Sequence, residues 1–391
     1  MNWDITPVSE LCTLAIDCVN KTAPLSEVDT PYKMLRTTNI KDGYIDFDHV
    51  RYVEKDVFDK WTRRGAPKYG DVLFTREAPV GEVGRFTSKS ENYFLGQRTF
   101  LYRADPNKLD WNYLAYILQS PQIQGWVNGI AYGATVPHLK VGDMEHLMIP
   151  APPLPTQQKI AKILSNFDDL IENNLKRIKL LEESARLTYE EWFLRFRIDG
   201  KKLDIDPETS LPFEWEKKKL GDYFPIVTGK KDANIQTNDG KYPFFTCSQG
   251  TYKTDVYSFD AEAIILAGNG EFNVKYYRGK FEAYQRNYVL IPDDRNYLFL
   301  LFLFMKHYLK EITYGSKGAV IKYLTKDMIE NANFIEPAEE LLVDFNKLIV
   351  PIFYEIENLD HQNQLLKEAR DILLPRLMTG MIDTDDMDVA V

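Results

Sequence analysis

The sequence has few cysteines and no long apolar run. Its three cysteines, Cys12, Cys18 and Cys247, are an odd number without a Cys-x-x-Cys pair. This excludes a disulfide framework and a zinc ribbon, and it favours a cytoplasmic protein. The strongest apolar run, Leu298 to Met305, is far shorter than the roughly 20 residues that a membrane span needs. Met1 to Glu10 also lack a basic segment followed by an apolar one, so we expect neither export nor membrane insertion.

The motifs of several common catalytic chemistries are missing as well. There is no Gly-x-x-x-x-Gly-Lys-Ser/Thr phosphate loop, because Gly315-Ser316-Lys317-Gly318 is too short to form one. There is also no Gly-x-Gly-x-x-Gly turn and no Asn/Asp-Pro-Pro-aromatic run of the kind that adenine methyltransferases carry. The five histidines are scattered and form no His-Glu-x-x-His motif. We therefore expect no catalytic residue, no metal site and no cofactor on this chain.

Positive charge is not in excess either. Lys and Arg number 48 against 58 Asp and Glu, which gives a formal net charge of -10 at pH 7. A protein that binds DNA over its whole surface would be basic, so any DNA binding must be local. Basic residues do gather in short segments, such as Arg63 to Lys68, Lys217 to Lys219 and Lys230-Lys231. Residues 381–391, in contrast, form an acidic tail.

What the sequence does contain is an internal repeat with an offset of about 185 residues. Gln97-Arg98 precedes one β-rich run and Gln285-Arg286 precedes another, and an apolar helix follows each run. Farther on, Tyr132 to Leu139 matches the segment Gly318 to Leu324. The chain is therefore predicted to be duplicated, in the order domain, helix, domain, helix.

The two predicted helices are long and amphipathic. Prolines at positions 150–155 stop the preceding element, Thr156 can cap the first helix, and apolar residues then recur every three or four positions to Trp192. The second helix repeats this spacing from Leu342 to Leu377. At about 1.5 Å per residue the first helix would span roughly 60 Å, too long for burial in one small domain. The two apolar stripes should therefore pair as an antiparallel coiled coil about a pseudo-twofold axis.

Four residues give testable predictions about the two long helices. In an antiparallel arrangement Asn174 falls close to Asn363, and we predict that their amides meet and fix the register. Pro351 should kink or restart the second helix, and Pro375 should end it, because proline has no amide hydrogen.

The predicted fold class is α+β, with two similar domains in tandem separated by two long helices. Strands are expected at residues 72–74, 100–102, 263–266 and 288–291, and shorter helices at 111–119 and 297–309. The predicted boundaries are 1–153 for the first domain, 154–200 for the first long helix, 201–336 for the second domain, 337–380 for the second long helix and 381–391 for the tail.

Two motifs carry a resemblance to a known family. Pro152-Pro153-Leu154-Pro155-Thr156-Gln157-Gln158-Lys159-Ile160 and Leu373-Leu374-Pro375-Arg376-Leu377-Met378-Thr379-Gly380, with the duplicated architecture, resemble the specificity subunits of type I restriction-modification enzymes. The resemblance covers nearly the whole chain. It implies a non-catalytic subunit whose two target-recognition domains read a bipartite site in double-stranded DNA. It also implies two adenine methyltransferase subunits and two ATP-dependent restriction subunits as partners, which would hold SAM, ATP and Mg.

Candidate DNA contacts follow from the composition of the loops. Lysines and arginines suit phosphates, and amides suit base edges. Either DNA contact or strand closure explains the repeated Gln-Arg pairs, and an ordinary solvated loop explains the basic residues near position 65 equally well. The candidates are Arg63, Arg64, Lys68, Tyr69, Gln97, Arg98, Thr135, Lys230, Lys231, Asn234, Gln249, Asn269, Gln285, Arg286, Ser316 and Lys317.

Alternative functions stay open at this point. One is a specificity subunit of a fused or different restriction-modification class. Another is a coiled-coil adaptor between proteins without DNA readout, which the acidic net charge favours and which predicts no salt-dependent DNA binding. An acidic mimic of DNA is disfavoured, because the carboxylates are interspersed with Lys and Arg.

Overall fold

The computed structural model describes residues 3–19, 21–90, 92–133, 137–314 and 322–384. It divides into two compact units: unit 1 comprises Met1–Asn174 and His361–Val391, and unit 2 comprises Leu175–Asp360. Each unit contains one of the two predicted domains together with part of both long helices. The unit boundary therefore falls within the helices, whereas the predicted domain boundaries fall at their ends.

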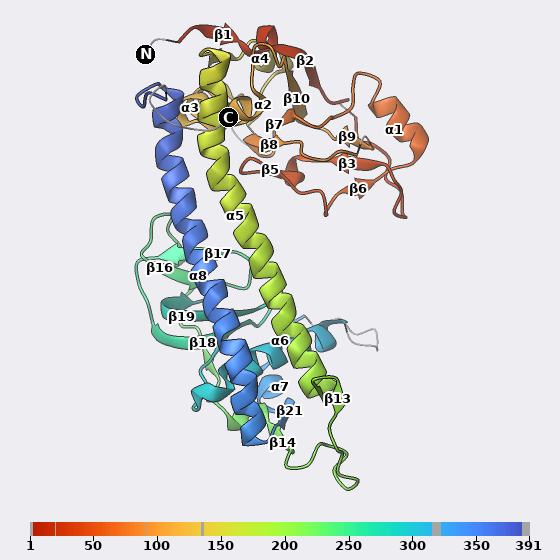
Figure 1. Ribbon diagram of the computed structural model, residues 1–391, viewed down its shortest axis with the longest axis vertical. Helices are drawn as coiled ribbons and strands as arrows, with labels where there is room; N and C mark the ends of the chain where they lie inside the picture. The colour runs from red at the N-terminus through yellow and green to blue at the C-terminus, as the bar shows by residue number, and fades with distance from the viewer. Residues whose placement is uncertain (1–2, 20, 91, 134–136, 315–321, 385–391) are drawn as a thin grey trace. The chain divides into compact units, whose positions relative to one another are not determined.

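Unit 1 is built on a four-stranded sheet in the order β2-β10-β7-β8, beside a three-stranded sheet in the order β6-β3-β9 (Figure 1). The short pairs β1-β11 and β4-β5 complete it. Its elements are β1 (Ile5–Pro7), β2 (Cys12–Asp17), β3 (Lys33–Leu35), β4 (Ile40–Lys41), β5 (Tyr44–Ile45), β6 (Arg51–Tyr52), α1 (Lys55–Trp61), β7 (Asp71–Arg76), β8 (Val80–Arg85), β9 (Tyr93–Leu95), β10 (Thr99–Ala104), α2 (Trp111–Gln119), α3 (Pro121–Ile130), α4 (Val141–Glu145), β11 (Met148–Pro150) and the first part of α5 (Leu154–Tyr189).

Unit 2 is built on a six-stranded sheet in the order β15-β20-β18-β19-β16-β17, with the pairs β14-β21 and β12-β13. A π-helical turn at Glu190–Leu194 follows α5. The other elements are β12 (Arg197–Ile198), β13 (Lys201–Lys202), β14 (Glu216–Lys219), β15 (Val227–Thr228), β16 (Tyr242–Phe245), β17 (Thr251–Thr254), β18 (Phe259–Ala267), β19 (Val274–Ala283), β20 (Asn287–Leu290), α6 (Leu298–Tyr314), α7 (Lys326–Glu330), β21 (Asn333–Glu336) and α8 (Glu339–Met378).

The predicted duplication is confirmed by strand order. The series β2-β10-β7-β8 in unit 1 recurs as β15-β20-β18-β19 in unit 2, and the pair β1-β11 recurs as β14-β21. The predicted match of Leu139 with Leu324 also holds at the level of hydrogen bonds. The amide of Leu139 donates to the carbonyl of Arg76 at 3.0 Å, and that of Leu324 donates to the carbonyl of Gly268 at 2.7 Å. The four predicted strands and two shorter helices coincide with β7, β10, β18, β20, α2 and α6, apart from a few terminal residues.

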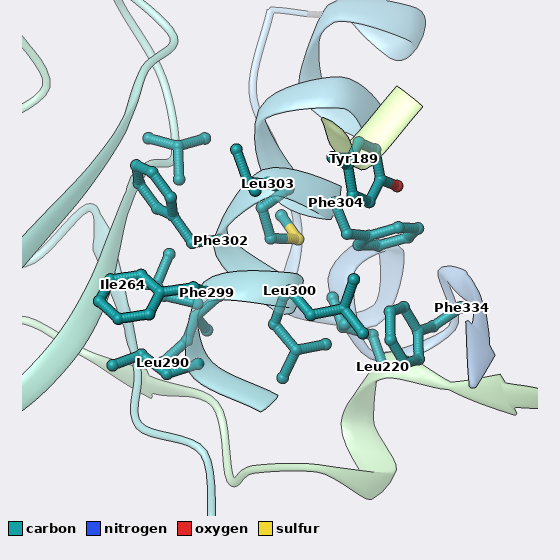
Figure 2. Packing of buried hydrophobic residues seen from close by; sticks show 14 of the residues in the cluster. Tyr189, Leu220, Ile264, Leu290, Phe299, Leu300, Phe302, Leu303, Phe304 and Phe334 are labelled. Carbon is teal, nitrogen blue, oxygen red and sulfur yellow. The ribbon is translucent and has the colours of Figure 1, made fainter. Parts of the chain in front are cut away.

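The core of unit 2 is centred on α6, which is apolar around most of its circumference. A helix of this kind must be covered on several sides. Figure 2 shows that Phe299 and Phe302 face the side chains of Ile264 and Leu290 from the sheet. On other sides of the helix lie Leu220 and Phe334, and Tyr189 of α5. The whole run Leu298 to Met305 is therefore buried.

The ends of the long helices differ from the sequence prediction. α5 begins at Leu154, so Thr156 lies inside the first turn and is not its cap. The buried side chain of Gln157 instead ties this turn to the domain, because it accepts from the amide of Asp110 at 2.9 Å and donates to the carbonyls of Lys108 at 3.0 Å and Pro152 at 2.8 Å.

α8 is a single helix that contains both of its prolines. It is not interrupted at Pro351, and it continues past Pro375 to Met378, so the predicted end at Pro375 was wrong. A proline inside a helix loses one hydrogen bond, and burial of neighbouring apolar residues can offset that loss. Leu377 and Met378, just after Pro375, are each only 1% exposed. Tertiary packing therefore overrides the local rule at this end.

The two long helices pair antiparallel within each unit. In unit 1 the amide nitrogen of Asn174 donates to the amide oxygen of Asn363 at 3.0 Å, and both side chains are buried. The predicted meeting of these two residues is confirmed, while their role in fixing the register stays a prediction. In unit 2 the Arg177 guanidinium lies 2.7 Å from the Glu355 carboxylate. Farther along α5, past its end, the ring of Phe193 packs edge-on against Phe345.

A buried ion network joins the unit 1 sheet to both helices. The carboxylate of Asp168 on α5 lies 2.7 Å from Arg85 of β8 and 2.7 Å from Arg370 of α8. It also accepts a 2.5 Å hydrogen bond from the hydroxyl of Tyr116 on α2. The Asp168 side chain is 5% exposed and that of Arg85 is 10% exposed. In unit 2 the ion pair at the corresponding place joins Arg278 of β19 to Glu357 of α8, at 3.0 Å, and it is far more exposed.

Replacing Asp168 with alanine is expected to destabilise unit 1 by about 3–5 kcal/mol, because it leaves the Arg85 charge buried without a partner. The matched control is Asp371→Ala, which removes the exposed carboxylate on the other side of Arg370 and should cost less than about 1 kcal/mol. Urea unfolding of the two variants measures the difference. Equal unfolding midpoints would show that the network does not stabilise the unit.

Candidate nucleic-acid interface

In unit 1 the Gln97-Arg98 pair forms the turn between β9 and β10. Arg98 has a positive φ of 70°, and its carbonyl accepts from the amide of Arg76 at 2.7 Å. The backbone of the turn therefore closes the neighbouring strand, while the Arg98 side chain stays half exposed. Its Nε lies 3.3 Å from Oε2 of Glu77, and the hydroxyl of Thr22 donates to the amide oxygen of Gln97 at 3.2 Å.

Three other loops of unit 1 meet at this turn and bring further cations. Glu77 forms a β-bridge with His138, and the ammonium of Lys140 lies 4.0 Å from the centre of the Tyr132 ring. Arg36 follows the strand β3, whose last carbonyl accepts from the amide of Gly96, just before the turn, at 2.7 Å. Basic side chains thus outnumber carboxylates on the described part of this surface, which we call face 1. It comprises residues 36–38, 77–79, 96–98, 132–133 and 137–140.

The Gln285-Arg286 pair occupies the same place in unit 2, at the turn that enters β20. The amide of Gln285 donates to the carbonyl of Lys231 at 2.9 Å, and the carbonyl of Arg286 accepts from the amide of Gly268 at 3.0 Å. The side chains of Gln285, Arg286 and Lys231 are all exposed. The backbone of this turn also closes a strand, and its side chains are again left available to a ligand.

The loop after β16 lies against the same turn. The thiol of Cys247 donates to the side-chain oxygen of Asn287 at 3.0 Å. The amide of Gln249 donates to a carboxylate oxygen of Glu271 at 2.9 Å. The ammonium of Lys275 donates to the carbonyls of Ser248 at 3.0 Å and of Gly250 at 2.9 Å. Residues 229–231, 247–250, 268–271, 275 and 284–287 thus form one surface, which we call face 2.

Partial burial affects Lys275, a cation that is built into face 2. It lowers the pKa of the Lys275 ammonium below its ordinary value, although the nearby charges of Cys247 and Glu271 act in the opposite direction. Because both carbonyls that Lys275 contacts belong to the loop 248–250, this lysine holds the loop in shape. The exposed cations of face 2 are instead Lys230, Lys231 and Arg286.

The structure gathers some of the predicted contacts and separates others. Lys230, Lys231, Gln249, Asn269, Gln285 and Arg286 lie on face 2, and Gln97 and Arg98 lie on face 1. Asn234 is exposed in a short 3-10 helix, Ala233–Ile235, a few residues beyond Lys231. Thr135, Ser316, Lys317 and most of the acidic tail lie outside the described residues.

The predicted basic residues in the loop before β7 do not lie beside the Gln97-Arg98 turn. Arg64 forms an ion pair with Asp17 at the end of β2. Lys68 and Tyr69, both exposed, precede β7, whereas Arg98 lies next to the far end of that strand. At about 3.3 Å per residue, the strand Asp71–Arg76 separates them by roughly 17 Å. Lys68 and Tyr69 are therefore not part of face 1, and exposed Arg63 lies in the same loop.

Sequence reasoning missed three basic residues of face 1 and one of face 2, namely Arg36, His138, Lys140 and Lys275. Arg36, His138 and Lys140 come from loops and Lys275 from β19, and none has a fixed spacing to the Gln-Arg turns. The repeat itself was the available signal, because it aligned the loop that ends at Leu139 with the loop that ends at Leu324.

The described residues contain no group of three or more His, Cys, Asp or Glu side chains that could hold a metal ion. Within the same residues, no helix combines the length and the apolar character required to cross a membrane. All three cysteines are unpaired. What the two faces offer is therefore exposed cations and amides on rigid turns, which are groups suited to phosphates and base edges.

Comparison with known proteins gives a consistent result. A family model described as the type I restriction modification DNA specificity domain matches residues 2–183 and 212–370. The chain is 28% identical over 348 residues to the type I restriction enzyme MjaIX specificity subunit of Methanocaldococcus jannaschii, which covers 81% of this chain and 79% of that protein. It is 37% identical over 174 residues to the EcoDI specificity subunit of Escherichia coli, which covers 44% of this chain and 39% of that protein. A crystal structure of the S subunit of a type I restriction-modification system from M. genitalium shares the fold, with a TM-score of 0.57, 18% identity and 96% of both chains covered.

The turn of face 2 should tolerate no side chain at Gly268. A Cβ there would lie 2.4 Å from the carbonyl oxygen of Arg286, so Gly268→Ala is expected to destabilise unit 2 by about 1–3 kcal/mol. The control is Gly250→Ala, whose Cβ would meet nothing closer than the Ser248 hydroxyl at 3.9 Å. Thermal unfolding measures both. A Gly268→Ala variant as stable as Gly250→Ala would mean that the turn is not tightly packed.

Proposed function

The chain belongs to the type I restriction-modification DNA specificity family, and we propose that it reads a two-part DNA sequence, one part with face 1 and the other with face 2. The protein is a specificity subunit that recognises the DNA target with two domains and is not itself catalytic. The proposal adds which surfaces of the two domains contact the DNA.

One observation carries the proposal: the same Gln-Arg turn recurs at the same place in both folds and presents an exposed arginine side chain in each. In each turn the arginine carbonyl accepts a backbone hydrogen bond from the neighbouring strand, so the side chains are presented by a rigid support. DNA attracts Arg and Lys through its phosphates, and this attraction acts locally even when the protein as a whole is acidic. A coiled-coil adaptor without DNA readout gives no reason for this duplication.

The gap between the two parts of the target is set, in this proposal, by the lengths of α5 and α8. These helices have 36 and 40 residues, which at 1.5 Å per residue corresponds to about 54 and 60 Å. Both helices contribute residues to both units, so neither can change length without the other. Half-sites read by linked domains are separated by whole or partial turns of B-DNA, each about 34 Å.

The catalytic steps belong to partners in this proposal. We expect two adenine methyltransferase subunits, which use SAM, and two restriction subunits, which use ATP and Mg. These assignments rest on family membership and on the absence, in the sequence, of the phosphate-loop and methyltransferase motifs discussed above. We expect the complex in the cytoplasm, where the host DNA would be its substrate, and free cysteines are typical of that compartment.

The test of the proposal is to co-express the chain with its genomic methyltransferase neighbour and to map N6-methyladenine in the host DNA by single-molecule sequencing. We expect a methylated motif in two parts with a constant gap. Exchanging residues 1–150 for those of a relative should alter one part only, because each domain reads its part independently. A stable complex that methylates no motif would support the adaptor function instead.

A second experiment tests the role of the helices. Inserting one heptad into both α5, after Asn174, and α8, before His361, adds about 10 Å, which corresponds to roughly three base pairs. The gap of the methylated motif should then lengthen by about three base pairs, with both parts unchanged, or methylation should be lost. A control with the heptad in α5 alone should lose methylation, because it breaks the antiparallel pairing. Methylation with the original gap would show that the helices do not set the spacing.

A further inference from the structure

The two Gln-Arg turns differ in one neighbour. In unit 1 the residue after Arg76 is Glu77, whose carboxylate pairs with Arg98. In unit 2 the residue at the corresponding place, after Gly268, is Asn269. The correspondence is structural, because Glu77 forms a β-bridge with His138 just as Asn269 does with Tyr323. Among the described residues, an acidic partner of the arginine is thus present at one turn and absent at the other.

This difference changes what each arginine can do. Glu77 approaches Nε of Arg98, so the two terminal amino groups of the guanidinium remain without a hydrogen-bond or ion-pair partner in the described residues. A long side chain loses rotamer freedom on binding, and a carboxylate that already holds it reduces that loss. The backbone of Arg98 is held by the hydrogen bond that its carbonyl accepts from the Arg76 amide. The ion pair with Glu77 thus limits the directions that the Arg98 side chain takes and leaves its two terminal amino groups available.

Arg286 has none of these restraints. Its side chain is exposed and has no hydrogen-bond or ion-pair partner in the part of the chain that the structure describes. It also keeps its full positive charge, with Lys230 and Lys231 exposed nearby, whereas the charge of Arg98 is compensated by Glu77. An exposed, uncompensated cation suits a phosphate, which can be contacted from many directions.

We propose that Arg98 reads a guanine through a bidentate contact with O6 and N7, that Glu77 is the positioning residue for this contact, and that Arg286 instead binds a DNA phosphate. The inference rests on the proposed function, because it assumes that faces 1 and 2 contact DNA. A fixed guanidinium fork matches the two acceptors of guanine in the major groove. The two copies of the repeat have thus taken different tasks, base recognition in one and charge neutralisation in the other.

The experiment measures binding of the complex with its methyltransferase partner to duplexes that carry the methylated motif or each single base-pair change in it, at several salt concentrations. In the part of the target read by the first domain, Arg98→Ala should reduce the preference for one G·C pair over the other base pairs by about 10- to 100-fold. The dependence of log K on log salt should stay the same. Arg286→Ala should weaken binding to all duplexes alike and reduce the salt slope by about one.

Two further variants sharpen the result. Glu77→Gln keeps the size of the side chain and removes its charge, so it should reduce preference at the same G·C pair that Arg98→Ala affects, by a smaller factor. Lys108→Ala removes a positive charge beyond the opposite end of β10 and should change neither preference nor slope. Base preference in the part of the target read by the second domain should stay unchanged in Arg98→Ala and Glu77→Gln. It is therefore the internal control that these variants are folded.

Uniform weakening with a reduced slope in Arg98→Ala would overturn the proposal, and so would loss of base preference in Arg286→Ala. If Arg98→Ala abolishes binding altogether, Glu77→Gln decides, because it retains Arg98. If Glu77→Gln loses base preference at a single base pair, the proposal is supported. If Glu77→Gln binds all duplexes more tightly, because a negative charge has been removed, the proposal is overturned. If the wild-type complex shows no base preference at all, the proposed function itself fails. This outcome is distinct from the outcomes named above for the variants.

Discussion

The structure depends on two amphipathic helices that neither domain covers by itself. In unit 1 Ile160 and Leu164 of α5 belong to the same buried cluster as Leu374 and Leu377 of α8. In unit 2 Phe193, just past α5, packs against Phe345 of α8. Unit 1 is thus completed only by residues 361–391, which follow the whole second domain in the chain. Because each buried cluster contains residues of both stripes, neither unit has a complete core without segments of both helices.

An ion pair joins each domain to the long helices, and the two pairs differ in how deeply they are buried. Asp168 is enclosed by Arg85, Arg370 and Tyr116, whereas the pair between Glu357 and Arg278 is open to solvent. A buried charge is costly unless fully paired, and an exposed pair contributes little. The first domain is therefore held to the helices by a geometry that tolerates little change, while the second relies more on the apolar packing of α6.

Periodicity and repetition made much of the fold predictable from the sequence. The strand and helix positions, the meeting of Asn174 with Asn363 and the equivalence of the two Gln-Arg turns all follow from spacing that can be counted along the chain. Pro375 was misjudged because a local rule was applied where burial of Leu377 decides. The Asp168 network could not be predicted, because Asp168 and Arg370 lie 202 positions apart. The composition of face 1 was equally hidden, since Arg36 and Lys140 reach it through loops whose paths no sequence pattern specifies.

In the proposed function, two separate faces of one chain read two separate parts of a DNA target. Missing-nucleoside interference on a DNA fragment that carries the methylated motif, bound to the assembled complex, tests this directly. We expect two clusters of bases whose removal weakens binding, separated by a stretch of bases whose removal does not weaken it. A single continuous cluster, or none, would contradict it.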